Sequence, residues 1–221
     1  MPLPELALGS DVISMAGNAS VPEKVAPRQR VPASERRDAL VEAAVHEFAK
    51  TGLHGTPVDR IARRVGVAQP YVFSLFASKR ELFLAAVERG FERVTQRFEA
   101  AAAEFDPAIA LPDTDVLMAM GQAYKELLSS DRDYLMLQLQ SYAACDDVLI
   151  RDRVRACYAQ LVSDVQRISG AEPERIDDFF RHGMWINVAA AMGVEDLSVG
   201  CEWVRAELDD PQAELDDART A

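Results

Sequence analysis

The sequence lacks several features that define common classes of protein. Its 221 residues contain no apolar run near the roughly 20 residues that a membrane-spanning helix needs. The first twenty residues contain no Lys or Arg, so the basic start of a secretory signal is missing. The three cysteines, Cys145, Cys157 and Cys201, are too few and too widely spaced for a disulfide framework or a CxxC metal site. We therefore expect a soluble, cytoplasmic protein with neither a metal nor a cofactor.

Patterns of catalytic residues are also missing. The three histidines, His46, His54 and His182, do not fit an HExxH motif or a Ser-His-Asp order. There is no glycine-rich phosphate loop, and acidic pairs such as Asp146-Asp147 are adjacent residues, which face different ways on a helix. No residue set supports an enzyme, so we expect the protein not to be one.

Negative charge dominates the chain but is unevenly distributed. The net charge is −12, yet residues 34–80 carry eight basic and five acidic residues, a net charge of +3. A small basic segment attached to an acidic remainder can contact a polyanion at one end and repel it at the other. An uneven distribution of charge on solvent-exposed helix faces, without any binding function, would give the same net charges.

Strand-like alternation is absent after residue 33, and apolar residues recur three and four apart, which predicts an all-α fold. We expect a flexible proline-rich tail over 1–33, a helix-turn-helix headpiece over 34–80, a helical body over 81–208 and an acidic tail over 209–221. Arg28 and Arg30 in the first tail either reach DNA or are passive. The expected helices cover 34–50, two short segments opening near 56 and 69, then 78–103, 113–129, 131–144, 147–169, 173–193 and 198–208.

The stretch 56–79 has the spacing of a helix-turn-helix motif. Thr56 and Pro57 suit the start of one short helix, and Gly66 suits a sharp turn that needs a positive φ. Ala62 is small where two helices must cross closely. The second short helix, over 69–75, would then present an outer surface whose side chains can read base edges in a major groove.

Residues 35–83 resemble the DNA-binding domain of TetR-family transcriptional regulators. The matching residues are Ile61-Ala62, Gly66-Val67, Phe73, Phe76 and Lys79, in the family pattern I-A-x-x-x-G-V followed by an aromatic and F-x-x-K. The resemblance implies a three-helix headpiece, a long linking helix, a divergent helical ligand-binding body and a homodimer.

The chain departs from the family pattern at two recognition positions. The family usually has Tyr where Phe73 stands, and Phe73 cannot donate that hydroxyl to a phosphate. Tyr71 stands where Thr is common, so its hydroxyl either replaces that phosphate contact or reaches a base. The DNA-contacting residues that we expect are Arg36, Thr56, Arg60, Gln69, Pro70, Tyr71, Phe73, Ser74 and Lys79.

The body is expected to hold a ligand pocket and a dimer interface. Met and aromatic residues with a polar tip are typical of adaptable apolar sites, although each residue is also compatible with ordinary core. Gly183, Asn187 and Ala191 recur every four residues, as in a helix that another helix approaches closely, whether within the protomer or across a dimer. The pocket candidates are Met120, Tyr124, Leu139, Tyr142, Cys157, Leu161 and Trp185, and the interface candidates are Phe179, Phe180, Gly183, Met184, Asn187 and Ala191.

Asn187 itself has three possible roles, because it could bind a ligand, its symmetry mate or a buried backbone group. Taken together, these features predict a homodimeric repressor of transcription that binds double-stranded operator DNA. A small apolar or cationic effector would relieve the repression. The alternatives are a small-molecule-binding helical protein whose headpiece no longer binds DNA, and an enzyme built on the helical body.

Overall fold

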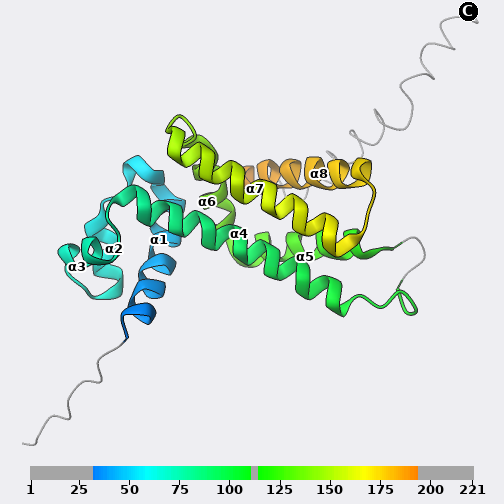
Figure 1. The fold of residues 1–221 in the computed structure, drawn as a ribbon, viewed down its shortest axis with the longest axis horizontal. Coiled ribbons are helices and arrows are strands. Elements are labelled where there is room, and N and C mark those ends of the chain that lie inside the picture. Colours follow the sequence, from blue (N-terminus) through cyan, green and yellow to red (C-terminus); the bar gives the residue numbers. More distant parts are fainter. Residues whose placement is uncertain (1–31, 111–113, 194–221) are drawn as a thin grey trace, which may run out of the picture. The chain divides into compact units, whose positions relative to one another are not determined.

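The computed structural model describes residues 32–110 and 114–193, which form eight helices with no strand among them (Figure 1). The all-α prediction is confirmed, and most helix bounds fall within three residues of those expected. The helices are α1 (Ala33–Gly55), α2 (Val58–Val65), α3 (Gln69–Leu75), α4 (Lys79–Glu104), α5 (Val116–Ser130), α6 (Arg132–Ala143), α7 (Val148–Ser169) and α8 (Pro173–Met192).

Helix α1 continues past its expected end at residue 50, because the chain kinks at Gly52 and then resumes a helical turn. Gly52 has φ 66° and ψ −174°, a conformation that side chains with a Cβ rarely adopt. A Cβ at this position would also collide with the side-chain oxygen of Gln140 on α6. Glycine is therefore required here both for the kink and for the close approach of α6.

The first four helices share one apolar core. Phe48 of α1 and Phe83 of α4 meet edge to face with ring centroids 5.0 Å apart. Ile61 of α2 and Val72 of α3 are almost completely buried against them, as is Phe76 just after α3. The short helices α2 and α3 are thus held by packing, because helices of seven or eight residues are not stable alone.

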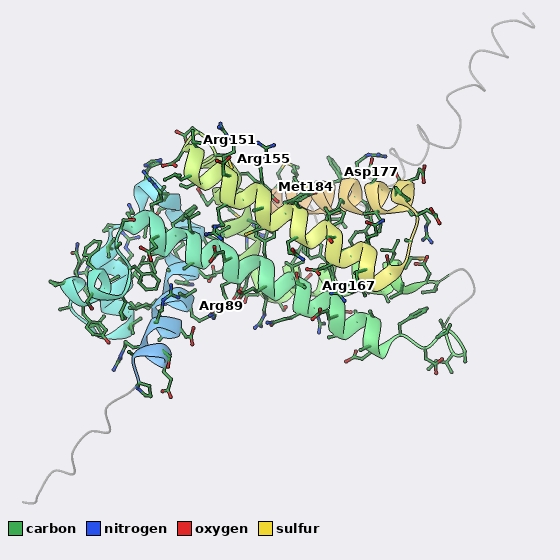
Figure 2. The ribbon with its side chains drawn as sticks, viewed as in Figure 1. Arg89, Arg151, Arg155, Arg167, Asp177 and Met184 are labelled. Atoms are coloured by element: carbon green, nitrogen blue, oxygen red, sulfur yellow. The ribbon has the colours of Figure 1, made fainter. Side chains whose placement is uncertain are left out.

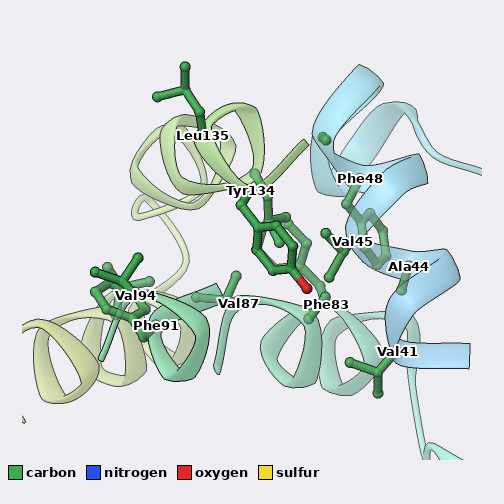
Figure 3. Packing of buried hydrophobic residues seen from close by; sticks show 14 of the residues in the cluster. Val41, Ala44, Val45, Phe48, Phe83, Val87, Phe91, Val94, Tyr134 and Leu135 are labelled. Atoms are coloured by element: carbon green, nitrogen blue, oxygen red, sulfur yellow. The ribbon is translucent and has the colours of Figure 1, made fainter. Parts of the chain in front are cut away.

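Helix α4 connects this region to the remaining helices. Its 26 residues extend about 39 Å at 1.5 Å per residue, and its buried stripe includes Phe83, Val87, Phe91 and Phe98. The side chain of Ser78 caps the helix by accepting a hydrogen bond from the Glu81 amide at 3.1 Å. Figure 3 shows how α4 side chains and residues of α1 and α6 fill one continuous cluster.

Helices α5 and α7 both pack along α4, and α8 packs on α5, α6 and α7 (Figure 1). The predicted helix over 198–208, both predicted tails apart from the last residues of the first, and Cys201 lie outside the described residues. Within the described ranges, no helix is both long enough and apolar enough to cross a membrane.

Candidate DNA-binding surface and internal cavity

The turn between α2 and α3 depends on Gly66. Its φ of 72° and ψ of 34° are left-handed, and its amide donates to the carbonyl of Arg63 at 3.1 Å. A Cβ there would meet nothing within 4 Å, so the requirement is for the backbone conformation and not for space. The turn directs α3 so that Val72 faces the core.

The opposite face of α3 is exposed. Gln69 and Pro70 in its first turn are exposed, and Tyr71 and Phe73 expose 38% and 42% of their surface. The hydroxyl of Ser74 donates to the Tyr71 carbonyl at 2.7 Å, so its own donor is used within the helix. Two large aromatic side chains left outside on a seven-residue helix are typical of a binding surface and not of packing.

Lys79 lies at the start of α4, but its ammonium group is partly engaged. Nζ donates to the carbonyl of His54 at 3.2 Å and so ties α4 to the end of α1. Partial burial lowers the pKa of Lys79 below its usual value, because desolvation disfavours the charged form. The residue can still offer further hydrogens to a phosphate, since an ammonium has three.

Arginines of α2 surround a buried carboxylate that the sequence reasoning did not single out. Glu47 of α1 is only 4% exposed, and its oxygens lie 3.7 Å from Arg60 Nε and 3.5 Å from Arg64 Nη1. Both arginine side chains remain about half exposed. Glu47 therefore holds two cations on the outer side of α2. In the sequence, only the excess of basic residues over 34–80 could have indicated a role for Arg64.

Two expected DNA contacts are placed differently. Thr56 is completely buried, and its hydroxyl lies 2.7 Å from the Gly52 carbonyl and 3.1 Å from the Glu47 carbonyl. Thr56 therefore stabilises the α1–α2 loop and does not cap α2. The expectation that Thr56 contacts DNA is wrong for this structure, because the residue is buried. Arg36 is half-buried and lines a cleft against α6. The guanidinium of the neighbouring Arg37 lies over the Phe76 ring, 4.5 Å from its centroid, a contact that the sequence analysis did not predict.

An apolar cavity lies among α4, α5, α6, α7 and α8. Its empty space, open mouth included, is about 910 Å³. Aromatic rings form much of its wall, with Phe98 and Phe179 meeting at 5.5 Å between centroids, and Phe179 and Phe180 at the same distance. The lining residues are Val87, Gly90, Phe91, Val94, Phe98, Gly121, Tyr124, Leu127, Leu128, Tyr134, Leu135, Leu137, Gln138, Tyr158, Leu161, Phe179, Phe180, His182, Gly183, Met184, Ile186 and Asn187.

Only two of the seven expected pocket residues, Tyr124 and Leu161, line this cavity. Met120 is completely buried in the core, and Trp185 is 40% exposed on the outside of α8, so both expectations are wrong for this structure. Leu139, Tyr142 and Cys157 are half-buried and do not line the cavity. Tyr142 contributes indirectly, since its hydroxyl lies 2.7 Å from the Gln138 amide.

Most of the expected interface residues belong to the cavity instead. Phe179, Phe180, Gly183 and Asn187 line it, and Asn187 is only 2% exposed, so its side chain is not available to a partner, whereas an interface role for the half-buried Phe179, Phe180 and Gly183 stays a prediction. Sequence periodicity identified a special face of α8 but could not show that α4 and α5 of the same protomer cover it. Met184 lines the cavity mouth and is also 37% exposed, while Ala191 is half-buried.

A different face of α8 is apolar and exposed. Met184, Trp185, Val188 and Met192 expose between 37% and 61% of their surface. Their spacing of three and four residues places them along one side of the helix, and Figure 2 marks Met184 on this helix beside α7. Among the described residues, no cluster of three or more His, Cys, Asp or Glu side chains could hold a metal ion.

A basic helix-turn-helix with an outward second helix is thus joined to helices that enclose an apolar cavity. The family model described as "Bacterial regulatory proteins, tetR family" matches residues 40–86. Residues 40–86 of this chain therefore match the TetR family, and the resemblance noted in the sequence is confirmed over this stretch.

Named relatives include two transcriptional regulators. The HTH-type transcriptional activator FasR of Mycolicibacterium smegmatis is 28% identical over 149 residues, which is 66% of each chain. The HTH-type transcriptional regulator RutR of Escherichia coli is 28% identical over 80 residues, 36% of this chain. The chain thus spans slightly under two thirds of FasR and 38% of RutR.

Solved structures share the fold. A transcriptional regulator from Pseudomonas aeruginosa superposes with a TM-score of 0.57 at 17% identity, over 81% of this chain and 91% of that one. The fatty acid degradation regulator FadR from Bacillus halodurans gives the same TM-score and identity, over 77% and 89% of the two chains. At these identities the likeness concerns the fold.

Proposed function

We propose that this protein is a homodimeric repressor of transcription that binds operator DNA through α3 and is released by a small molecule in the apolar cavity. The observation that carries the proposal is the exposure of one face of α3, including Gln69, Tyr71 and Phe73, on a helix fixed by Gly66 and Val72. The named relatives, which are transcriptional regulators, support the regulatory role but not its direction, since FasR is an activator.

The α3 surface is chemically suited to double-stranded DNA. Gln69 can bond adenine N6 and N7 together, and Tyr71 and Phe73 can contact a thymine methyl group or the sugar-phosphate backbone. Lys79 and the two arginines fixed by Glu47 supply cations for phosphates beside the groove. Residues 34–80 have a net charge of +3, whereas the rest of the chain is acidic, so the charge favours approach through this region.

The exposed apolar face of α8 supports a homodimer. Trp185, Val188 and Met192 together form a larger exposed apolar surface than scattered single residues would. A second copy packing on this face would bury it across a two-fold axis and bring two α3 helices to one operator. Recognition helices about one DNA turn apart, roughly 34 Å, would then read two half-sites.

The cavity supports relief by a small molecule. Its walls come from α4, which begins at the DNA-binding region, and from α8, which carries the proposed interface. A molecule that fits one arrangement of these helices better than another shifts the population toward it. The spacing of the two α3 helices would change with that shift.

The test is binding of the full-length chain to DNA fragments from the region upstream of its own gene, measured by fluorescence anisotropy over a salt series. The proposal predicts tight binding that weakens steeply as salt rises, since phosphate contacts release counterions. Absence of salt-dependent binding to any fragment would favour the alternative, a small-molecule binder without DNA function. A reporter fused to the bound fragment tests the direction of regulation, because loss of a repressor raises transcription, and a fall would contradict repression.

A further inference from the structure

The lining of the cavity carries almost no ionic charge. Among the described residues, the lining is aliphatic or aromatic apart from Tyr124, Tyr134, Gln138, Tyr158, His182 and Asn187, and it includes no Asp, Glu, Lys or Arg. Bringing a cation or an anion into such a lining without a partner costs several kcal/mol. The lining therefore favours an uncharged molecule, and the cationic half of the expectation from composition finds no carboxylate to support it.

Polar groups in the wall are concentrated in one chain of hydrogen bonds. The hydroxyl oxygen of Tyr124 lies 2.6 Å from Asn187 Oδ1 and 3.0 Å from Gln138 Oε1. Gln138 continues the chain to the hydroxyl of Tyr142 at 2.7 Å. Burial raises the pKa of the Tyr124 hydroxyl, and it raises that of Tyr142 to about 12, so both remain neutral donors at physiological pH.

One phenolic proton on Tyr124 cannot serve two acceptors at once. The shorter contact assigns it to Asn187, and a half-turn of the Gln138 amide then completes a relay. In that relay Tyr142 donates to Gln138, Gln138 donates to Tyr124, and Tyr124 donates to Asn187. The donors of these four side chains that are then left over are the amide hydrogens of Asn187 and one amide hydrogen of Gln138.

Asn187 is thereby left with an amide donor that the relay does not use, on a residue that lines the cavity. Asn187 is only 2% exposed and lines the cavity, and within the described part of the chain only its Oδ1, and not its Nδ2, takes part in a hydrogen bond. A buried amide without a partner costs free energy, and a ligand atom that accepts its hydrogen would recover that cost. The relay through Gln138 and Tyr142 fixes Asn187 in this orientation.

We propose that the cavity takes an uncharged, elongated apolar molecule with one hydrogen-bond acceptor, such as an ester or ketone oxygen, and that Asn187 Nδ2 donates to this acceptor. The cavity wall follows α4 from Val87 to Phe98, about 16 Å at 1.5 Å per residue, which suits an extended chain better than a compact ring. The inference rests on the proposed function only in taking this cavity for the effector site.

The first experiment compares four probes on the full-length chain without DNA: methyl decanoate, undecane, decanoate and decylammonium. Affinities come from displacement of an environment-sensitive apolar dye. Methyl decanoate should bind about tenfold more tightly than undecane, the equivalent of about 1.4 kcal/mol, and both ions should bind more weakly than the ester. Equal or tighter binding of either ion, or no preference for the ester, would overturn the inference.

The second experiment repeats the ester and alkane measurements on Asn187→Leu. The ratio of the two affinities should fall toward one, and because it is taken within one variant, it is insensitive to a general loss of stability. The matched control is Leu161→Val, another cavity-lining change, which should leave the ratio unchanged. An unchanged ratio in Asn187→Leu contradicts the role of Asn187. If Asn187→Leu does not fold, Asn187→Ala replaces it under the same criterion.

The inference and the proposed function fail in distinguishable ways. Ester binding that depends on Asn187, without any change in DNA affinity, would support the inference and contradict effector relief. Release of DNA by decylammonium, with no Asn187-dependent ester binding, would support effector relief and contradict the inference.

Discussion

The hydroxyl of Tyr134 on α6 donates a hydrogen bond to the carboxylate of Glu42 on α1 across 3.1 Å, while the Tyr134 residue also lines the apolar cavity. Glu42 is held from another side by Arg89 of α4. The next residue toward the N-terminus, Asp133, contacts His46 of α1. The first turn of α6 thus joins the cavity to the helix that supports the DNA-binding surface.

Replacing Tyr134 by Phe should weaken that connection. We expect the loss of DNA affinity caused by a bound ligand to shrink about fivefold, as for one hydrogen bond worth about 1 kcal/mol. The affinity for ligand without DNA should change less than twofold. Anisotropy titrations with and without saturating methyl decanoate measure both quantities. Tyr158→Phe is the control, because Tyr158 also lines the cavity but is on α7; equal effects in the two variants would refute the coupling.

Gly66→Ala should destabilise the protein and weaken DNA binding. A left-handed backbone costs a residue with a Cβ about 1–2 kcal/mol, and relaxing that strain moves α3. Gly183→Ala is the control, because Gly183 is inside α8, its φ is not positive, and a Cβ there would meet nothing within 4 Å. The control should gain up to about 1 kcal/mol. Urea unfolding curves measure both changes, and equal shifts of the same sign would contradict the account of the turn.

Val188→Lys should convert the proposed dimer to monomers. A lysine in the centre of the apolar face formed by Trp185, Val188 and Met192 would bury an unpaired charge in the proposed interface. Sedimentation velocity measures the result, and cooperative binding to two half-sites should be lost with it. Ile109→Lys is the control, since Ile109 is 84% exposed and lies in the turn after α4. A dimer that persists in Val188→Lys would show that the interface lies elsewhere.

Asp115 should give the stability of α5 a dependence on acidic pH. Partial burial raises the pKa of its carboxyl, but the Met118 amide at 3.0 Å and the guanidinium of Arg175 outweigh this, so the pKa is lowered overall. A carboxyl with a lower pKa when folded stabilises the protein above its unfolded pKa of about 3.9, and this contribution is lost as pH falls through the folded pKa.

Asp115→Ala should therefore cost about 1 kcal/mol at pH 7, as for a lost helix cap, and less at pH 3. Thermal unfolding across this range measures the difference. Asp115→Asn retains a capping oxygen without charge, so its smaller cost should vary less with pH. A cost of Asp115→Ala that is the same at pH 3 and pH 7 would contradict the role of the charge.

The sequence predicted the helices and the turn well because these depend on local chemistry. The turn between α2 and α3 needs a residue with a positive φ, which glycine adopts readily in any tertiary context, and Ser78 caps the helix that follows it. The exposed side of α3 follows from the spacing of its buried residues, Val72 and Phe76.

Tertiary contacts decided what the sequence could not. Thr56 is a favourable N-cap residue, yet its hydroxyl donates a hydrogen bond to the Gly52 carbonyl at the kink of α1 instead of capping α2. Asn187 and Trp185 lie two residues apart on α8, and only the positions of α4 and α5 determine that one faces the cavity and the other solvent.

The most direct test of the central claim, that α3 reads base pairs, uses the upstream fragment that the protein binds. Each base pair of one half-site is exchanged in turn, and affinities are measured for the wild-type chain and for Gln69→Ala. The account predicts that wild type loses about 1–3 kcal/mol at an adenine position and that Gln69→Ala no longer distinguishes the bases there, while discrimination elsewhere is kept. Identical base preferences for the two proteins at every position would contradict it.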